Sequence, residues 1–141
     1  MNFKMIYCLF GLVMLSACNH KQDIAKIKGE ESFHRSVSVY EGKKIIDQNK
    51  GNADFVILDM RTEGEISEGF IKSAVFHNYH SSGFRENLDK LNKDKTYLIY
   101  CRSGGRSGQA LSLMKELGFK RVFDMQGGID GWKRAGYPVS K

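Results

Sequence analysis

The sequence predicts a single α/β domain built on a central parallel β-sheet of about five strands, with helices on both faces. Short, continuous apolar runs such as Phe55–Leu58 and Tyr97–Tyr100 alternate along the chain with amphipathic segments, and such runs are typical of strands buried on both faces. The 141 residues, 41% hydrophobic and 27% charged, suffice for one domain with a real core and not for two.

Local patterns predict the first elements. Ser36–Val39 alternates in character and indicates a short strand or strand edge. Tyr40–Asn49 has the composition of a helix despite Gly42, and Gly51 offers a place for that helix to close. Phe55–Leu58 then predicts a buried strand.

The middle of the chain continues the alternation. Thr62 is expected to cap a short helix over Glu63–Glu68, because Glu65 stands at the third helical position of a capping box. Ala74–Phe76 is expected to form the third strand, and Ser82–Leu91 predicts a further helix.

The last third predicts two more strands and two more helices. Tyr97–Tyr100 indicates the central strand. Apolar residues at i, i+3, i+4 and i+7 then predict a helix that ends at Gly118: Ala110, Leu113, Met114 and Leu117. Arg121–Asp124 is the expected last strand and Gly128–Arg134 the last helix. Ligands of such sheets bind at the carboxyl ends of the strands.

One cysteine, Cys101, stands where the central strand ends, a glycine-rich turn follows and a helix begins. Glycines let consecutive backbone N–H groups turn inward as a nest for an anion, and the first helical turn adds unpaired N–H groups. Arg102 and Arg106 add positive charge. These features favour the thiolate and lower a cysteine pKa by roughly one to five units. An inert, buried cysteine is the alternative, which the neighbouring arginines and glycines disfavour.

The N-terminus resembles that of a bacterial lipoprotein. Lys4 precedes an apolar run over Met5–Leu15, which is too short to span a bilayer and has the length of a signal-peptide core. Leu15-Ser16-Ala17-Cys18 matches the lipobox pattern, which implies cleavage before Cys18 and lipidation of that cysteine. An ordinary signal peptide with a chance cysteine is the alternative.

We therefore expect a signal peptide over residues 1–17, a lipidated N-terminus and polar tether over 18–35, and a folded domain over 36–141. The protein is expected to be exported and lipid-anchored on the periplasmic or cell-surface side of a bacterial membrane, where Cys101 is the one free thiol. The formal net charge of +6 comes without long Lys/Arg blocks, so a nucleic-acid partner is not expected.

Four motifs together resemble the single-domain rhodanese family, over about Val37–Val139. In chain order, they lie at Leu58–Thr62, Glu68–Val75, Cys101–Ser107 and Gln126–Trp132. The resemblance implies a rhodanese-like fold and a sulfurtransferase activity.

The resemblance also implies roles for residues. Cys101 would attack a small anionic sulfur donor such as thiosulfate, form a persulfide and pass the sulfur to cyanide or a thiol. The substrate and the persulfide would be held by the loop residues Arg102, Ser103, Gly104, Gly105, Arg106 and Ser107. No cofactor is implied.

Other residues near the predicted site have less direct roles. Asp59 and Arg61 are expected to pair and pin adjacent loops, and Trp132 is expected to pack beneath the active-site loop. His77 and His80 are expected to be loop histidines, although a contribution to the site stays open. They lack a third metal ligand at a suitable spacing, so no metal site is expected.

Three alternatives remain. Cell-division-cycle dual-specificity phosphatases and arsenate reductases share a Cys…Arg loop, but theirs has five intervening residues, whereas four separate Cys101 from Arg106. The domain is alternatively a non-catalytic rhodanese-like binding module, although such modules typically lose the cysteine. The third alternative is that the protein is a sulfur carrier, which accepts sulfur and delivers it to an envelope protein.

Overall fold

The computed structural model describes residues 32–141. The predicted signal peptide, the lipidation site Cys18 and most of the predicted tether lie outside these residues. The described residues form one compact unit.

Five parallel strands form one sheet, which confirms the predicted fold class. Their spatial order is β1-β5-β4-β2-β3, so β4 is central and β1 and β3 are the edges. The strands are β1 (Phe33–Val37), β2 (Phe55–Asp59), β3 (Val75–Phe76), β4 (Thr96–Tyr100) and β5 (Arg121–Met125).

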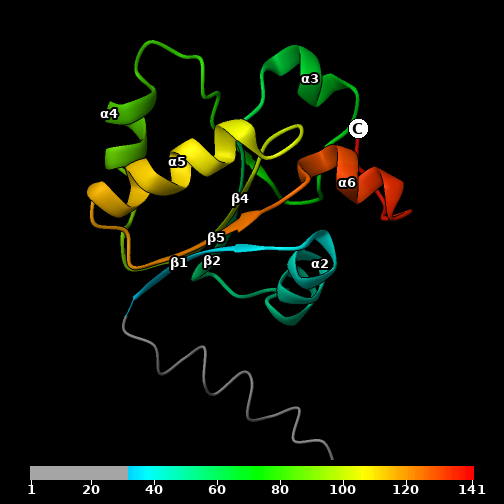
Figure 1. Cartoon of the computed structure of the whole chain (residues 1–141), viewed down its shortest axis with the longest axis horizontal. Helices are drawn as coiled ribbons and strands as arrows, with labels where there is room; N and C mark the ends of the chain where they lie inside the picture. The colour runs from blue at the N-terminus through cyan, green and yellow to red at the C-terminus, as the bar shows by residue number, and fades with distance from the viewer. Residues whose placement is uncertain (1–31) are drawn as a thin grey trace, which may run out of the picture. The chain divides into compact units, whose positions relative to one another are not determined.

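Helices cover both faces of this sheet (Figure 1). The helices are α2 (Val39–Gln48), α3 (Glu63–Ser67), α4 (Phe84–Asp89), α5 (Gly105–Glu116) and α6 (Gly128–Arg134). On one face α2 packs against β5 and α6, and on the other α5 lies over β1, β4 and β5 beside α4. The main apolar core lies under α5, where Ala110 and Met114 meet Ile99 and Val122, all four of them buried.

The first strand lies earlier than expected. It occupies Phe33–Val37, and Val39 begins α2, because Ser38 caps that helix and forms a capping box with Glu41. The folded unit therefore includes residues that the sequence pattern assigned to the tether, and a domain start at residue 36 is too late. His34 and Arg35 are polar and interrupt the apolar pattern by which strands are predicted. An edge strand such as β1, which pairs only with β5, tolerates them.

The other elements lie within a few residues of their expected positions. The capping box of Thr62 and Glu65 at the start of α3 is confirmed, with the Thr62 hydroxyl accepting from the Glu65 N–H. The expected strand Ala74–Phe76 is shorter by one residue, and the expected helix Ser82–Leu91 shrinks to α4. The last helix, Gly128–Arg134, lies where it was predicted.

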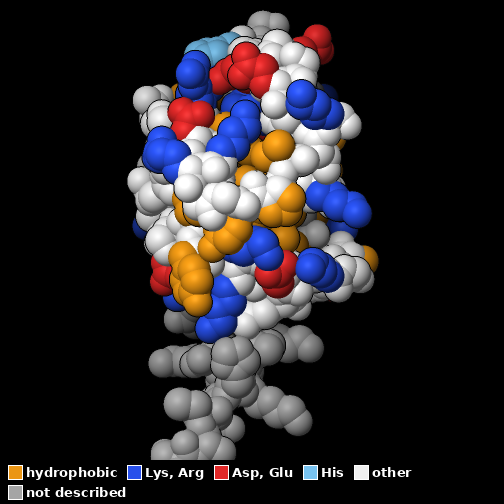
Figure 2. All heavy atoms as spheres, turned by 90° about the vertical axis from the view of Figure 1, so that its right-hand side faces the viewer, with side chains coloured by type: hydrophobic (Ala, Val, Ile, Leu, Met, Phe, Trp, Pro, Cys, Tyr) orange, Lys and Arg blue, Asp and Glu red, His pale blue; other side chains and the backbone are white. Residues whose placement is uncertain are grey.

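The surface seen in Figure 2 carries Lys and Arg side chains scattered among acidic and apolar ones, with no single basic patch on this face. The exposed large apolar side chains of the described residues are Tyr40, Val75, Phe76 and Val139. Between residues 32 and 141, no helix is long and apolar enough to cross a membrane.

Candidate active site

The candidate nucleophile, Cys101, follows the central strand β4 directly and is only 1% exposed. Gly104 is the N-cap of α5 and has φ +113°, a left-handed conformation that glycine adopts without steric cost. This turn brings the backbone N–H of Gly104 to 3.1 Å from the Cys101 Sγ, to which it donates. The strand, the turn and the helix thus meet at the sulfur, as the sequence predicted.

The pKa of Cys101 reflects two opposing effects. Burial raises it, whereas the backbone N–H and hydroxyl of Ser107 and the N–H groups of Gly104 and Ser103 lower it, and the lowering prevails. The sulfur is therefore held by hydrogen-bond donors that favour its charged form, in a site closed to bulk water.

The side chain of Arg106 is paired with an acidic residue of α3. Its Nη1 and Nη2 donate to Glu65 Oε2 and Oε1 at 2.8 and 2.6 Å. The Arg106 hydrogen bonds lower the pKa of Glu65 to about 2, so this pair is ionised at any physiological pH. The guanidinium also interacts with Cys101. It therefore joins α3 to the loop and contributes positive charge beside the sulfur.

The side chain of Arg102 is more exposed than that of Arg106. Its side chain is 67% exposed, and its Nε approaches Asp130 Oδ2 at 3.4 Å. Both arginines of the loop thus have carboxylate partners, which the sequence does not indicate. Of the two, Arg106 is the one whose pKa Cys101 raises.

This difference predicts unequal effects of two matched substitutions. Arg106→Ala should raise the pKa of Cys101, because it removes a cation that interacts with the sulfur and leaves the Glu65 carboxylate unpaired nearby. Arg102→Ala should leave that pKa nearly unchanged. The pH dependence of thiol alkylation measures both, and equal shifts in the two variants would contradict this account of the loop.

The loop rests on the start of α6. Ile129 and Asp130 donate their backbone N–H groups to the carbonyl oxygens of Cys101 and Arg102, at 3.0 and 3.1 Å. Gly128 has φ +53°, and a Cβ there would lie 2.3 Å from the Cys101 carbonyl oxygen. Glycine is therefore required at this position, because α6 packs directly against the backbone of the loop.

Trp132 on α6 is buried and anchors the C-terminal tail. Its Nε1 donates to the carbonyl oxygen of Pro138 at 2.9 Å, and its ring packs against Tyr137 with centroids 4.9 Å apart. The contacts that define its position are thus with the tail that follows α6.

Asp59 and Arg61 form a fully buried ion pair at the end of β2. The guanidinium binds both Asp59 oxygens and donates to the carbonyl oxygens of Glu65 and Gly69, each at 2.9 Å. The Tyr100 hydroxyl donates to Asp59 at 2.6 Å. Because these bonds reach Glu65 within α3 and Gly69 just after it, they position Glu65 and, through it, Arg106.

The two histidines lie apart from these contacts. His77 is half-buried beside the ring of Phe84, and burial lowers its pKa. His80 packs against Tyr79. Within the described residues, neither imidazole hydrogen-bonds to the loop, and no group of three or more His, Cys, Asp or Glu side chains forms a metal site.

The sequence assigns no role at the site to two acidic residues that the fold places beside or beneath it, Glu65 and Asp124. Glu65 was recognised only as a helix cap, and the sequence gives no sign of its pairing with Arg106 across 41 residues. Asp124 ends the expected last strand, and its burial beneath α5 follows from the packing of that helix over β5.

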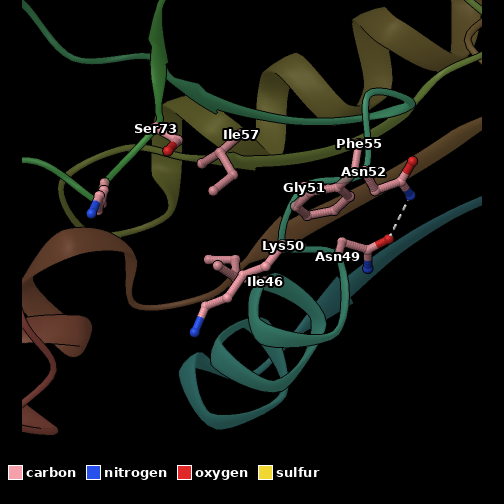
Figure 3. Close-up of a pocket in the computed structure, with 9 residues that line it drawn as sticks. Ile46, Asn49, Lys50, Gly51, Asn52, Phe55, Ile57 and Ser73 are labelled. Carbon is pink, nitrogen blue, oxygen red and sulfur yellow. Dashed lines mark hydrogen bonds between the residues drawn. The ribbon is translucent and has the colours of Figure 1, made fainter.

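A cavity of about 380 Å³ lies elsewhere in the molecule. It is lined by residues of α2, β2 and the segments that follow α2 and precede β3, with Ile46, Phe55 and Ile57 as apolar walls and Lys50 and Lys72 among the polar ones (Figure 3). No residue of the loop from Cys101 to Ser107 lines it.

A cysteine held by backbone N–H groups at the carboxyl end of a parallel strand defines a class of α/β proteins with a reactive thiol. This chain belongs to the rhodanese-like domain family, whose model matches residues 38–135.

Several relatives have sulfurtransferase names. A sulfurtransferase of Allochromatium vinosum is 38% identical over 86 residues, covering 61% of this chain and 78% of the relative. A thiosulfate sulfurtransferase of Coxiella burnetii is 33% identical over 108 residues, covering 77% and 94%.

The chain is also similar to a solved structure and to a longer relative with a different name. A rhodanese-related protein from Thermoplasma volcanium has a TM-score of 0.63 at 30% identity, covering 75% of this chain and 97% of that structure. A tRNA uridine(34) hydroxylase of Photorhabdus laumondii is 34% identical over 112 residues, but this chain covers only 31% of its length.

Proposed function

We propose that this protein is a sulfurtransferase that carries a sulfane sulfur as a persulfide on Cys101. The observation that carries the proposal is the set of donors around the sulfur, in which the Gly104 N–H lies 3.1 Å from Sγ and the nearby groups of Ser107 and Ser103 lower its pKa. Donors placed in this way favour a thiolate before the reaction and an anionic persulfide after it.

Thiosulfate is the donor that we propose, in keeping with the name of the Coxiella relative. The Cys101 thiolate attacks the outer sulfur, the S–S bond of thiosulfate breaks, and sulfite leaves with the bonding electron pair. Attack of cyanide or a thiolate on the terminal persulfide sulfur then regenerates the Cys101 thiolate. No external oxidant or reductant is needed in either step.

The pairing of Arg106 supports sulfur transfer over phosphate chemistry. An arginine that stabilises a phosphoryl group presents its two-pronged guanidinium to the phosphate oxygens. Here both Nη atoms already donate to Glu65. Together with the four-residue spacing between Cys101 and Arg106, this arrangement favours transfer of a single sulfur atom.

The test is a sulfur-loading experiment on the full-length chain in detergent. Incubation with thiosulfate should add the mass of one sulfur atom, and cyanide should then remove it with formation of thiocyanate. A chain that gains no sulfur although its Cys101 is alkylated readily would contradict the proposal and direct attention to phosphate or arsenate substrates, or to a binding role.

For the cellular location we propose export and a lipid anchor on Cys18, which the lipobox match Leu15-Ser16-Ala17-Cys18 supports. Such an anchor would hold the domain beside a bacterial membrane, close to an envelope protein that supplies or receives the sulfur.

Replacing Cys18 by Ser should release the protein from the membrane fraction, because the lipid would be the principal attachment to the bilayer. Cell fractionation and labelling with a fatty-acid analogue measure the two consequences. A Cys18→Ser protein that stays bound and labelled would show that the anchor lies elsewhere.

A further inference from the structure

A buried carboxyl group lies beneath the candidate active site and has no part in the chemistry described above. Asp124 stands near the carboxyl end of β5, level with Ser36 of the neighbouring strand β1, and is 0% exposed. Its Oδ2 lies 3.7 Å from the position that a Cβ of Gly108 would occupy, so the carboxyl group packs against the first turns of α5.

The hydrogen bonding of Asp124 is incomplete. Gln126 donates from its side-chain amide to Oδ2 at 2.6 Å, whereas Oδ1 is buried and has no partner among the described residues. No Lys or Arg of residues 32–141 forms an ion pair with Asp124. A carboxylate placed there is poorly compensated, which gives a reason for the group to bind a proton.

The hydroxyl of Ser107 connects this carboxyl group to the sulfur. It lowers the pKa of both Cys101 and Asp124. Ser107 is 0% exposed, and the Cβ position of the next residue, Gly108, lies 3.7 Å from Asp124 Oδ2, so the hydroxyl is enclosed in the turn that separates the two groups. Its Oγ also lies 3.3 Å from the carbonyl oxygen of Gly104, a long hydrogen bond. A hydroxyl has one hydrogen to donate, so these three acceptors compete for it.

We propose that Asp124 is a positioning residue that controls the Cys101 sulfur through Ser107. When Asp124 is protonated, the Ser107 hydroxyl is free to donate to the thiolate. When Asp124 is ionised, it takes that hydrogen bond and adds a negative charge beneath the loop. The affinity of the sulfur for a proton then rises, and the thiolate becomes scarcer at a given pH.

The surroundings of Asp124 set the direction of this coupling. Burial raises its pKa, whereas the polar side chains of Ser107, Gln126 and Ser36 oppose that rise without cancelling it. From β4, the residue level with Asp124 is the apolar Ile99, and the nearest titratable residue on the same face of β1 is His34. The charged groups of the loop and their partners are Cys101, the Arg106–Glu65 pair and the Arg102–Asp130 pair.

The test compares site-resolved alkylation rates of wild type and Asp124→Asn over a range of pH. Trypsin releases Cys101 in the peptide Thr96–Arg102, so its alkylation is read separately from that of other cysteines of the full-length chain. Alkylation needs no sulfur donor. The inference concerns the thiol of the proposed function, but its failure is distinguishable from failure of sulfur transfer.

The expected signature is a ratio of variant to wild-type rates that changes with pH. At low pH Asp124 is neutral in the wild type, and at high pH both thiols are ionised, so the ratio should be close to one at both ends. Between them it should reach about three- to tenfold, since a removed like charge shifts a nearby pKa by about half a unit to one unit. A ratio that is flat with pH would overturn the proposal.

Asp130→Asn is the matched control, because Asp130 is an acidic residue beside the same loop whose side chain contacts Arg102 instead of Ser107. The ratio of Asp130→Asn to wild-type alkylation rates should not change with pH. If Asp124→Asn does not fold, NMR titration of the Asp124 carboxyl carbon in the wild type replaces it. Alkylation of Cys101 with iodoacetate, which leaves a carboxylate on the sulfur, should then raise the Asp124 pKa relative to alkylation with neutral iodoacetamide, because the coupling between the two charges is reciprocal. An unchanged titration would overturn the proposal.

Discussion

Replacing Cys101 by Ser should abolish the gain of sulfur from thiosulfate and reduce thiocyanate formation by roughly a thousandfold or more. An alcohol has a far higher pKa than a thiol, so the donors that lower the pKa of Cys101 cannot produce an alkoxide near neutral pH. Serine is also close to cysteine in size, so the loop should keep its shape. Intact mass after incubation with thiosulfate measures the loss.

The matched control is the same replacement at another cysteine. Cys18→Ser, solubilised in detergent, should gain one sulfur and discharge it to cyanide like the wild type. A Cys101→Ser chain that still gains sulfur would place the persulfide on another residue. If both Cys101→Ser and Cys18→Ser fail to gain sulfur while the wild type gains it, Cys18 takes part in the transfer, contrary to the role proposed here.

The fold was largely predictable because the local sequences of the central strands β4 and β2 each contain a continuous apolar run. Tyr97–Tyr100 and Phe55–Leu58 are continuous apolar runs, and strands buried on both faces need such runs. The edge strand β1 was placed late for the complementary reason. It pairs on one side only, so it tolerates His34 and Arg35, and its apolar pattern is weak.

The position of the candidate nucleophile and of its hydrogen-bond donors was also predictable, because they lie within seven consecutive residues. Cys101 and the N–H groups of Ser103, Gly104 and Ser107 depend on one turn, which the glycines specify. The partners of the arginines were not predictable in this way. Arg106 meets Glu65 only because α3 and α5 approach each other in three dimensions.

The site also depends on pairings between strands. Tyr100 was expected only as a buried strand residue, yet its hydroxyl donates to Asp59 from the neighbouring strand. Asp124 belongs to a strand whose pattern suggested only apolar burial. Register and helix packing decide which polar atoms meet, and a single sequence carries little information about either.

Replacing Arg61 by Ala should destabilise the domain by about 3–5 kcal/mol, the largest stability loss that we expect from one side chain. The guanidinium is 2% exposed, and its removal leaves the buried Asp59 carboxylate without its cation. It also leaves the carbonyl oxygens of Glu65 and Gly69 without their donor. Urea denaturation of the full-length chain measures the loss.

Two controls separate the buried charge from the loss of packing. Lys93→Ala breaks an exposed ion pair with Asp89 and should cost far less, since solvent screens that pair. The double variant Asp59→Leu with Arg61→Met removes both charges and should recover part of the stability lost by Arg61→Ala. It should not recover sulfur transfer, because without the bonds to Glu65 and Gly69 helix α3 no longer holds Arg106 beside the sulfur. If the double variant is no more stable than Arg61→Ala, the loss comes from the unpaired carbonyl groups and not from the buried carboxylate.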